Sequence, residues 1–282
     1  IVDEYHCFLC GEKINIEPEI PSIQKYTISQ CNCCGLYSPN IYPSENIVYN
    51  SSDYEKKQIS SIENHYNYRK KIMGKERFEY VKSFSNKNSS NLRILDVGCG
   101  AGYFIDYACD YVENIVGTEV SDKLIKRARK RNLNVVKLEE VGDIFDIVTM
   151  FDVLEHLESP VDFFKSLRSR LDENGIIVAY TPNIESIAYY LMGEKQNTLL
   201  PFEHYCFFNT QSLNYLCSHS GYKIINIDYY GWDIMDYLLL KEYEDGINYC
   251  KKLQELIPSL QTIVDKQQIS NHMRVVFGKT TI

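Results

Sequence analysis

The chain has 282 residues, of which 44% are hydrophobic and 24% charged, and its formal net charge is −8. This length suits one large domain, or one large and one small domain, each with a core. The acidic balance disfavours nucleic acid as a partner, and the sequence contains no apolar run of membrane-spanning length. The first residues also lack the charged-then-apolar layout of a secretory signal.

Two cysteine pairs lie near the start of the chain, Cys7-x-x-Cys10 and Cys31-x-x-Cys34, with 20 residues between them. This spacing is close to that of four-cysteine zinc sites. Four thiolates would close a tetrahedral shell, so we expect a structural Zn²⁺ rather than a catalytic one. Cys33 offers a second register, but the glycine that follows Cys34 favours Cys34.

The alternative is that these cysteines are free thiols of a disordered start of the chain. Ten cysteines in a chain of this length do not suggest a small disulfide-rich secreted domain, so we expect a reducing, cytoplasmic protein. We assign residues 1–45 to the cysteine segment. Residues 46–90 are expected to form a helical linker that covers a ligand site, with a helix around Ser61–Phe84.

From Leu92 onward, strands and helices alternate, which predicts an α/β fold with a parallel sheet wrapped by helices. The last helix of this run should begin after Ser159 as N-cap, with Pro160 at its first position and Gly175 near its C-cap. The expected strands are 93–98, 114–120, 134–138, 145–153 and 176–182, and the expected helices are 103–110, 122–132 and 159–175.

The tail predicts a helix at Gln211–Ser220, a strand at 222–230, helices within about 234–271 and a last strand at 272–278. Within the helical stretch, apolar residues recur at helical spacing, and Pro258 should break or kink the helix. These apolar residues are Leu253, Leu256, Leu260, Ile263 and Val264. We expect residues 234–271 to be an insertion that acts as a lid or as a homodimer face.

The stretch "LRILDVGCGAGYF" places three glycines after the first expected strand. Gly98, Gly100 and Gly102 form G-x-G-x-G with Asp96 two residues ahead, whereas the nicotinamide fingerprint would need a glycine at Tyr103. The pattern resembles motif I of the class I S-adenosylmethionine (SAM)-dependent methyltransferases. A glycine turn without a cofactor is the alternative.

This resemblance implies that the loop backbone, Cys99 included, cradles the methionine and ribose part of SAM and that Asp96 supports it. In the family, the second strand ends in an acid that accepts both ribose hydroxyls. Glu119 stands at that position, about twenty residues downstream, as a ribose-binding acid should.

Residues 145–183, with "LEH" and "TPN", resemble the fourth and fifth strands of the ubiquinone-type and polysaccharide-cluster methyltransferases. The resemblance implies a Rossmann-like, doubly wound sheet whose last strand runs antiparallel next to the fifth. It places Met150 and Phe151 at the methyl-transfer end of the cofactor pocket. The cysteine segment also resembles the zinc ribbon that precedes many bacterial methyltransferases of surface-glycan and sugar pathways.

A hydroxyl or carbon acceptor needs a base, and His156 and His204 lie where the related family builds its acceptor pocket. Either histidine could instead hold a helix end or a loop. Asp152 could contact acceptor or cofactor, or complement a helix N-terminus. The basic helix 122–132 should bury Leu124, Ile125 and Ala128, with its charges solvated.

We therefore predict methyl transfer from SAM to a small-molecule or glycan acceptor, most plausibly a hydroxyl of a sugar, nucleotide-sugar or surface-polysaccharide precursor. Sugar C-methylation and ribosomal RNA methylation are alternatives within enzymes. A catalytically inactive binding or scaffold protein is the alternative from a different class.

Overall fold

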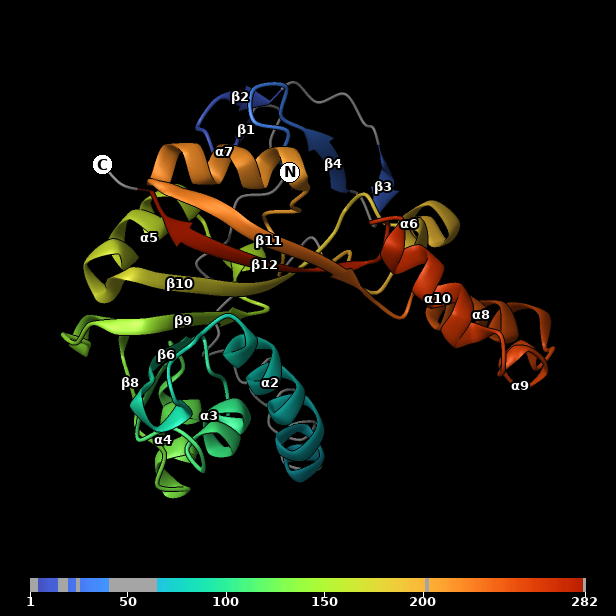
Figure 1. Ribbon diagram of the computed structural model, residues 1–282. Coiled ribbons are helices and arrows are strands. Elements are labelled where there is room, and N and C mark those ends of the chain that lie inside the picture. Colours follow the sequence, from blue (N-terminus) through green and yellow to red (C-terminus); the bar gives the residue numbers. More distant parts are fainter. Residues whose placement is uncertain (1–4, 15–19, 24–25, 41–64, 201–202, 281–282) are drawn as a thin grey trace. The chain divides into compact units, whose positions relative to one another are not determined.

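The computed structural model describes residues 5–14, 20–23, 26–40, 65–200 and 203–280 (Figure 1). The chain divides into two compact units, each built from several segments. The glycine-loop unit comprises Ser44–Val153, Phe164–Ala179 and Phe277–Ile282, and the cysteine unit comprises Ile1–Pro43, Leu154–Phe163 and Tyr180–Val276.

The largest sheet has seven strands in the order β11-β12-β10-β9-β6-β7-β8. β6 pairs in parallel with β7 and β9, and β7 pairs in parallel with β8. The last strand of the chain, β12, runs antiparallel beside β10, so the predicted Rossmann-like order is confirmed. The strands are β6 (Arg93–Val97), β7 (Asn114–Thr118), β8 (Val135–Val136), β9 (Phe145–Phe151), β10 (Leu171–Pro182), β11 (Tyr222–Tyr230) and β12 (His272–Lys279).

The central strands are apolar because both of their faces are covered. All seven residues of β9 are buried, as are the last four residues of β6. Near-continuous apolar runs are typical of parallel strands flanked by helices on both sides. A polar side chain inside such a strand therefore needs a hydrogen-bond partner. Asp96 of β6 and Thr149 of β9 form such a pair.

Helices connect the strands and cover the sheet. α3 packs against β7, α4 packs against β8, and α2 packs on α3. In α4, the Ser121 hydroxyl caps the N-terminus, and Leu124, Ile125 and Ala128 are buried as predicted.

The α-helices are α2 (Lys75–Ser83), α3 (Tyr103–Ala108), α4 (Asp122–Lys130), α5 (Pro160–Leu167), α6 (Ile187–Met192), α7 (Thr210–Ser220), α8 (Asp233–Asp245), α9 (Tyr249–Leu253) and α10 (Ile257–Lys266). The short turns are η1 (Arg69–Gly74, π-helical) and the 3₁₀ turns η2 (Ser89–Asn91), η3 (Leu138–Glu140), η4 (Leu154–His156), η5 (Arg168–Arg170) and η6 (Gly193–Lys195).

The helix predicted at 159–175 is shorter than expected. It begins at Pro160, and the Ser159 carbonyl accepts the first helical hydrogen bond, from Phe163 N. It ends at Leu167, and Gly175 lies inside β10 rather than near a C-cap. Gly175 is needed there because a Cβ would come within 2.8 Å of the Leu171 side chain.

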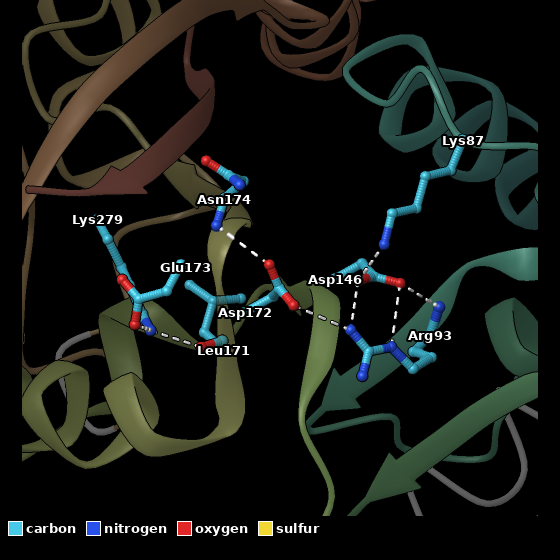
Figure 2. Close-up of polar contacts among 8 residues, drawn as sticks. All are labelled: Lys87, Arg93, Asp146, Leu171, Asp172, Glu173, Asn174 and Lys279. Atoms are coloured by element: carbon cyan, nitrogen blue, oxygen red, sulfur yellow. Dashed lines mark hydrogen bonds and ion pairs between the residues drawn. The ribbon is translucent and has the colours of Figure 1, made fainter.

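A charged cluster surrounds the start of β10 (Figure 2). Arg93 donates to Asp146 Oδ1 at 2.7 Å and to Asp172 Oδ2 at 3.1 Å, and Lys87 donates to Asp146 Oδ1 at 2.8 Å. Lys279 of β12 donates to the Leu171 carbonyl. These contacts link the starts of β6 and β9 to Leu171–Asp172, and they come from side chains far apart in sequence, which is why the sequence pattern missed this part of the strand.

Replacing Asp146 with asparagine is expected to cost about 2 kcal/mol of unfolding free energy at neutral pH. Burial alone would raise the pKa of Asp146, but hydrogen bonds from Arg93 and Lys87 lower it to about 2. A lowered carboxyl pKa gives stability that is present above the unfolded value near 4 and is lost as the pH falls towards 2. Urea unfolding across this range should therefore show a flatter pH dependence for Asp146→Asn. Asp143→Asn, at an exposed neighbouring position, is the control, and an equal effect of both variants would contradict the prediction.

The chain before β6 is helical from residue 65 to 83, and it contains the π-helical turn Arg69–Gly74. Tyr66 and Phe78 are buried while Ile72 is exposed, because a π-helical turn shifts the helical register. Gly74 allows close approach to α3, since a Cβ there would lie 2.9 Å from Tyr107 Cβ. The predicted helix start at Ser61 and the boundary between residues 45 and 46 lie outside the described residues.

The cysteine unit contains two small antiparallel sheets near the start of the chain. The first pairs β1 (Tyr5–His6) with β2 (Lys13–Ile14), and the second has the order β3 (Ile20–Ile23), β4 (Tyr26–Gln30), β5 (Tyr37–Pro39). The Tyr5 hydroxyl donates to the Ser38 carbonyl at 3.0 Å and so ties the two sheets together. Ile28 packs with Ile184, Leu199 and Phe207, which anchors the second sheet to the rest of its unit.

The helical stretch between β11 and β12 consists of α8, α9 and α10, and Pro258 stands in the first turn of α10, so it breaks the helix as predicted. Val264 is buried, whereas Leu256, Leu260 and Ile263 are 56%, 40% and 57% exposed. Whether this stretch is a lid or a homodimer face stays a prediction.

Candidate functional site

The glycine loop between β6 and α3 adopts a backbone that side chains disfavour. Gly98, Gly100 and Gly102 have φ values of +68°, +56° and +84°. A Cβ at Gly98 would lie 2.5 Å from Val153 Cγ2, and one at Gly102 would lie 2.6 Å from Leu133 Cδ1. A Cβ at Gly100 would meet no described atom within 4 Å, so this face of the loop is open. Such a loop can bring its backbone against a ligand.

Main-chain hydrogen bonds fix the path of the loop. Cys99 N donates to the Thr118 carbonyl at 2.9 Å, and Gly102 N donates to the Cys99 carbonyl at 2.9 Å. The Cys99 side chain is buried, and burial raises its pKa, so the thiol stays protonated. Cys99 would therefore contribute its backbone rather than a reactive sulfur to a ligand site.

Glu119 follows β7 and faces the glycine loop. Its Oε2 accepts from Gly100 N at 2.9 Å, while Oε1 accepts from Val120 N and Ser121 N at 2.8 and 2.9 Å. A carboxylate has about four acceptor positions and these three bonds use three of them, so one ribose hydroxyl can donate to Oε2 in this arrangement, and a second would have to replace a backbone bond. The structure thus brings Gly100, which has free space beside its Cα, next to Glu119, the acid that the sequence predicts to bind ribose.

Asp96, at the end of β6, is almost completely buried. Thr149 of β9 donates to its Oδ1 at 2.7 Å. Burial raises the pKa of Asp96 to about 7, although the Thr149 hydrogen bond and the nearby Arg77 charge act against it. Asp96 is thus held in place below the loop, where it can support the loop and a bound ligand.

These residues fit SAM. An open backbone cradle lies beside an anchored carboxylate, and diols are suited to bidentate contact with a carboxylate. Gly98, Cys99, Gly100 and Gly102 would hold the cofactor by their backbone, with Glu119 at the ribose. When bound, SAM supplies an activated methyl group on a sulfonium.

The end of β9 carries the residues that are predicted to lie near the methyl group of SAM. Met150 is fully buried, and the Phe151 ring packs edge-on against Phe104 at 5.0 Å between ring centres. Asp152 has a left-handed backbone, with φ +59°, and its side chain is 50% exposed. The left-handed turn directs the chain away from the strand at this point.

Arg77 of α2 is a residue that sequence analysis missed. Its side chain is 7% exposed, and its Nη2 donates to Asp152 Oδ2 at 2.9 Å. It also donates to the Tyr103 hydroxyl, and its guanidinium lies 4.5 Å from the centre of the Phe151 ring. The helical linker thus carries a buried cation to the end of β9. In the sequence Arg77 is one of many charged residues in its segment, so no pattern marked it as a site residue.

Replacing Arg77 with methionine is expected to weaken SAM binding about tenfold, since SAM carries a carboxylate on its methionine part and a charge-assisted hydrogen bond contributes about 1.5–3 kcal/mol. Arg77→Lys should recover part of the affinity because it keeps the charge but not the planar fork. Isothermal titration with SAM measures both. Lys75→Met, on the same helix and 56% exposed, is the control. Unchanged affinity in Arg77→Met would contradict the prediction.

His156 and His204 lie together in the cysteine unit. Their ring centres are 4.7 Å apart with a near-perpendicular angle of 81°. His156 Nδ1 is 2.6 Å from the Glu203 carbonyl, and His204 Nδ1 is 2.9 Å from the Thr198 carbonyl. The two histidines predicted from separate motifs therefore form one cluster, whereas Asp152 belongs to the other unit.

The four cysteines predicted as metal ligands also lie together. All four sulfur atoms fall within 4.8 Å of one another. The Cys7 and Cys34 sulfurs are 3.4 Å apart, and those of Cys10 and Cys31 are 3.5 Å apart. A tetrahedral Zn²⁺ with Zn–S bonds of about 2.3 Å separates its sulfurs by roughly 3.8 Å. Cys33 is exposed and lies outside the group, which agrees with the register favoured by Gly35.

The turns around these cysteines suit a metal. Gly11 and Gly35 both have φ +77°, and their N–H groups donate to the Cys7 and Cys31 carbonyls at 2.9 and 2.8 Å. The hydrogen bond between the Cys7 and Cys34 sulfurs lowers the pKa of Cys7 to about 6. The same hydrogen bond raises the pKa of Cys34. Four thiolates can be ionised together here only beside a cation, so this donor set fits Zn²⁺.

Residues 66–227, more than half of the chain, match the family model described as a methyltransferase domain. The chain is 30% identical over 132 residues to the mitochondrial ubiquinone biosynthesis O-methyltransferase of Candida albicans, covering 40% of each protein. It is also 30% identical over 128 residues to the tRNA U34 carboxymethyltransferase of Histophilus somni, covering 41% of this chain and 38% of that protein. The matched part spans less than half of these relatives.

Solved structures share the fold. A SAM-dependent methyltransferase from Archaeoglobus fulgidus superimposes with a TM-score of 0.51 at 19% identity, covering 74% of this chain and 94% of that one. The plantazolicin methyltransferase BpumL, in complex with a pentazolic desmethylPZN analog and SAH, gives a TM-score of 0.53 at 15% identity, covering 83% of this chain and 93% of that one. At these identities the likeness establishes the fold alone. Among the described residues, no helix is both long enough and apolar enough to cross a bilayer.

Proposed function

The chain belongs to the methyltransferase-domain family, and on that premise we propose that it is a SAM-dependent methyltransferase that methylates a hydroxyl of a sugar, a nucleotide-sugar or a surface-polysaccharide precursor. The observation that supports the cofactor site most directly is the hydrogen bond between Glu119 and Gly100 N. It holds Glu119, the acid proposed to bind ribose, beside the glycine loop. The identity of the acceptor is the more specific part of the proposal.

Three features support a small hydroxyl acceptor. The Candida relative carries the name of an O-methyltransferase, so oxygen is an acceptor in similar proteins. The four-cysteine segment resembles the ribbon that precedes methyltransferases of sugar and glycan pathways. The net charge of −8 disfavours a polyanionic substrate such as RNA. The name of the tRNA-directed relative keeps RNA as the second candidate.

The chain's own residues would act by positioning. Methyl transfer from a sulfonium requires the acceptor oxygen in line with the breaking bond and exclusion of water. The loop backbone and Glu119 would fix the cofactor, and Phe151 would border its reactive end, with Asp152 held beside it by Arg77. The acceptor proton is released to solvent as the methyl ether forms. His156, His204 and Asp152 remain the predicted acceptor-side residues.

The test is methyl transfer from SAM to a panel of nucleotide-sugars, a catechol and a structured RNA, read by mass spectrometry as a gain of about 14 Da. We expect a gain on a nucleotide-sugar, with the new methyl on oxygen by NMR. A methyl group on carbon would favour the C-methyltransferase alternative, and transfer to RNA alone would overturn the sugar proposal. SAM binding without transfer to any acceptor would favour an inactive binding protein.

We propose a reducing, cytoplasmic location for this activity. All ten cysteines lie in the described part of the chain, and none forms a disulfide there. Thiols persist in reducing compartments, and zinc-bound thiolates are typical of them.

A further inference from the structure

We propose that a cavity beside the first cysteine pair binds a small organic amine in its ammonium form. The cavity has a volume of about 580 Å³, and small-molecule sites typically have volumes of about 300–1,000 Å³. Residues 6–11 form one wall, and residues around the start of α5 form the other. Both walls belong to the cysteine unit, so the inference does not depend on the proposed acceptor.

Hydrogen bonds and ring packing hold the two walls. In the cysteine turn, Gly11 N donates to the Cys7 carbonyl at 2.9 Å. The ring of Phe8, in the same turn, lies 5.7 Å from the ring of Tyr205. Tyr205 N in turn donates to the Glu155 carbonyl at 2.9 Å, shortly before α5 begins. Tyr205 therefore connects the cysteine turn to the segment that leads into α5.

Part of the lining is apolar. Phe8 and Val161 are half-buried, Leu9 is buried, and all three line the cavity. Such side chains can pack against a hydrocarbon framework. An aromatic ring also attracts an ammonium group through its quadrupole, so Phe8 suits a cation that carries an apolar part.

The charged part of the lining is acidic. Glu158 and Asp162 are exposed residues of the lining, and none of the described residues that line the cavity is a lysine or an arginine. Cys7 and Cys10 also line it, and four thiolates with one Zn²⁺ carry a net charge of about −2. Burial raises the pKa of Tyr205 to about 12, and the charge of Glu158 acts in the same direction, which places this carboxylate near the Tyr205 ring.

Two positive contributions oppose these acids, and both are smaller. The N-terminus of α5 lies at the cavity and carries about half a positive charge. His6 adds at most one charge when it is protonated. The two carboxylates and the zinc–thiolate group outweigh both, so the cavity selects cations. Neither Glu158 nor Asp162 belongs to a group of described residues that could hold a metal ion, which favours an organic cation.

The size of the cavity favours a small molecule over a protein partner. Ten residues line it, whereas each partner contributes about 20–30 residues to a standard protein interface. A molecule with one ammonium group on a short hydrocarbon framework can contact the apolar and the acidic residues together. The ligand that fits this lining is therefore a small primary amine.

The test titrates the full chain, with Zn²⁺ at the cysteines, with phenethylamine and with its neutral N-acetyl derivative. We expect calorimetry to show one bound phenethylamine, and NMR to show shifts of the Phe8 and Val161 resonances. The acetylated compound should bind at least about tenfold more weakly, because charge-assisted hydrogen bonds are roughly twice as strong as neutral ones. Glu158→Gln should weaken phenethylamine binding about tenfold and reduce its preference over the acetylated compound. Glu113→Gln makes the same change at an exposed position of the glycine-loop unit and should bind as the unaltered protein does.

The absence of phenethylamine binding to the unaltered protein would overturn the proposal. Equal affinity for phenethylamine and its acetylated form would also overturn it, because the cavity would not distinguish the charge. Unchanged affinity in Glu158→Gln would place the amine elsewhere. A lysine-containing tripeptide that binds more tightly than phenethylamine would replace the small molecule with a peptide as the ligand. Retained zinc and an unchanged circular dichroism spectrum identify variants that are folded.

Discussion

Replacing Glu119 with alanine is expected to weaken SAM binding by roughly 100-fold or more. Hydrogen bonds to a charged group contribute about 1.5–3 kcal/mol each, and every 1.4 kcal/mol is a factor of ten. The ribose would lose its acceptor. The change also removes the acceptor of Gly100 N, Val120 N and Ser121 N, so the loop would lose its anchor as well.

Isothermal titration with SAM and SAH measures the loss directly. Thermal unfolding gives a second reading, since ligand at one hundred times its Kd stabilises the folded state by about 2.7 kcal/mol. Glu119→Gln should lie between the unaltered protein and Glu119→Ala because it keeps one acceptor oxygen. Glu139→Ala, at an exposed position nearby, is the matched control. Full SAM affinity in Glu119→Ala would show that the ribose is bound elsewhere.

Replacing Cys31 with serine is expected to abolish stoichiometric zinc binding at the cysteine site and to unfold the two small sheets around it. Structural zinc contributes about 10–16 kcal/mol of apparent binding energy in zinc-finger peptides, far more than such small sheets could gain from their own cores. Because Tyr5 joins β1 to Ser38 beside β4, loss of one ligand should affect both sheets.

Zinc released by a mercurial thiol reagent reports the cysteine site alone, and limited proteolysis reports its folding. Cys33→Ser is the matched control, since Cys33 adjoins two of the ligands but is exposed and outside the cluster. It should retain one zinc per chain and its protease resistance. Loss of zinc in Cys33→Ser would show that the other register, with Cys33 in place of Cys34, holds the metal.

The glycine loop could be predicted because its requirements are local. Positive φ values at Gly98, Gly100 and Gly102 favour glycine whatever surrounds them, and the apolar β6 ahead of them is contiguous in sequence. Glu119 could be predicted for a related reason, since one helical connection separates parallel neighbours. Its bond to Gly100 is a tertiary contact, but the topology makes it almost inevitable.

The early part of β10 could not be predicted in this way. Leu171 to Gly175 continue a helical pattern in sequence but belong to β10, where Arg93 contacts Asp172 and Lys279 contacts the Leu171 carbonyl. Arg77 was equally hidden, because its burial depends on how α2 packs against the loop. Propensity cannot anticipate contacts whose partners lie 75 or more residues away.

The sequence by itself determined the fold class, the glycine loop with its acid and the two cysteine pairs, because each depends on residues close together or on a regular alternation of strands and helices. Only the tertiary structure decided which cysteines meet, that Arg77 reaches Asp152, and that His204 joins Glu155 and His156. Such juxtapositions arise from packing and from long-range main-chain hydrogen bonds. They depend on where the chain returns in space, which no local pattern of residue types specifies.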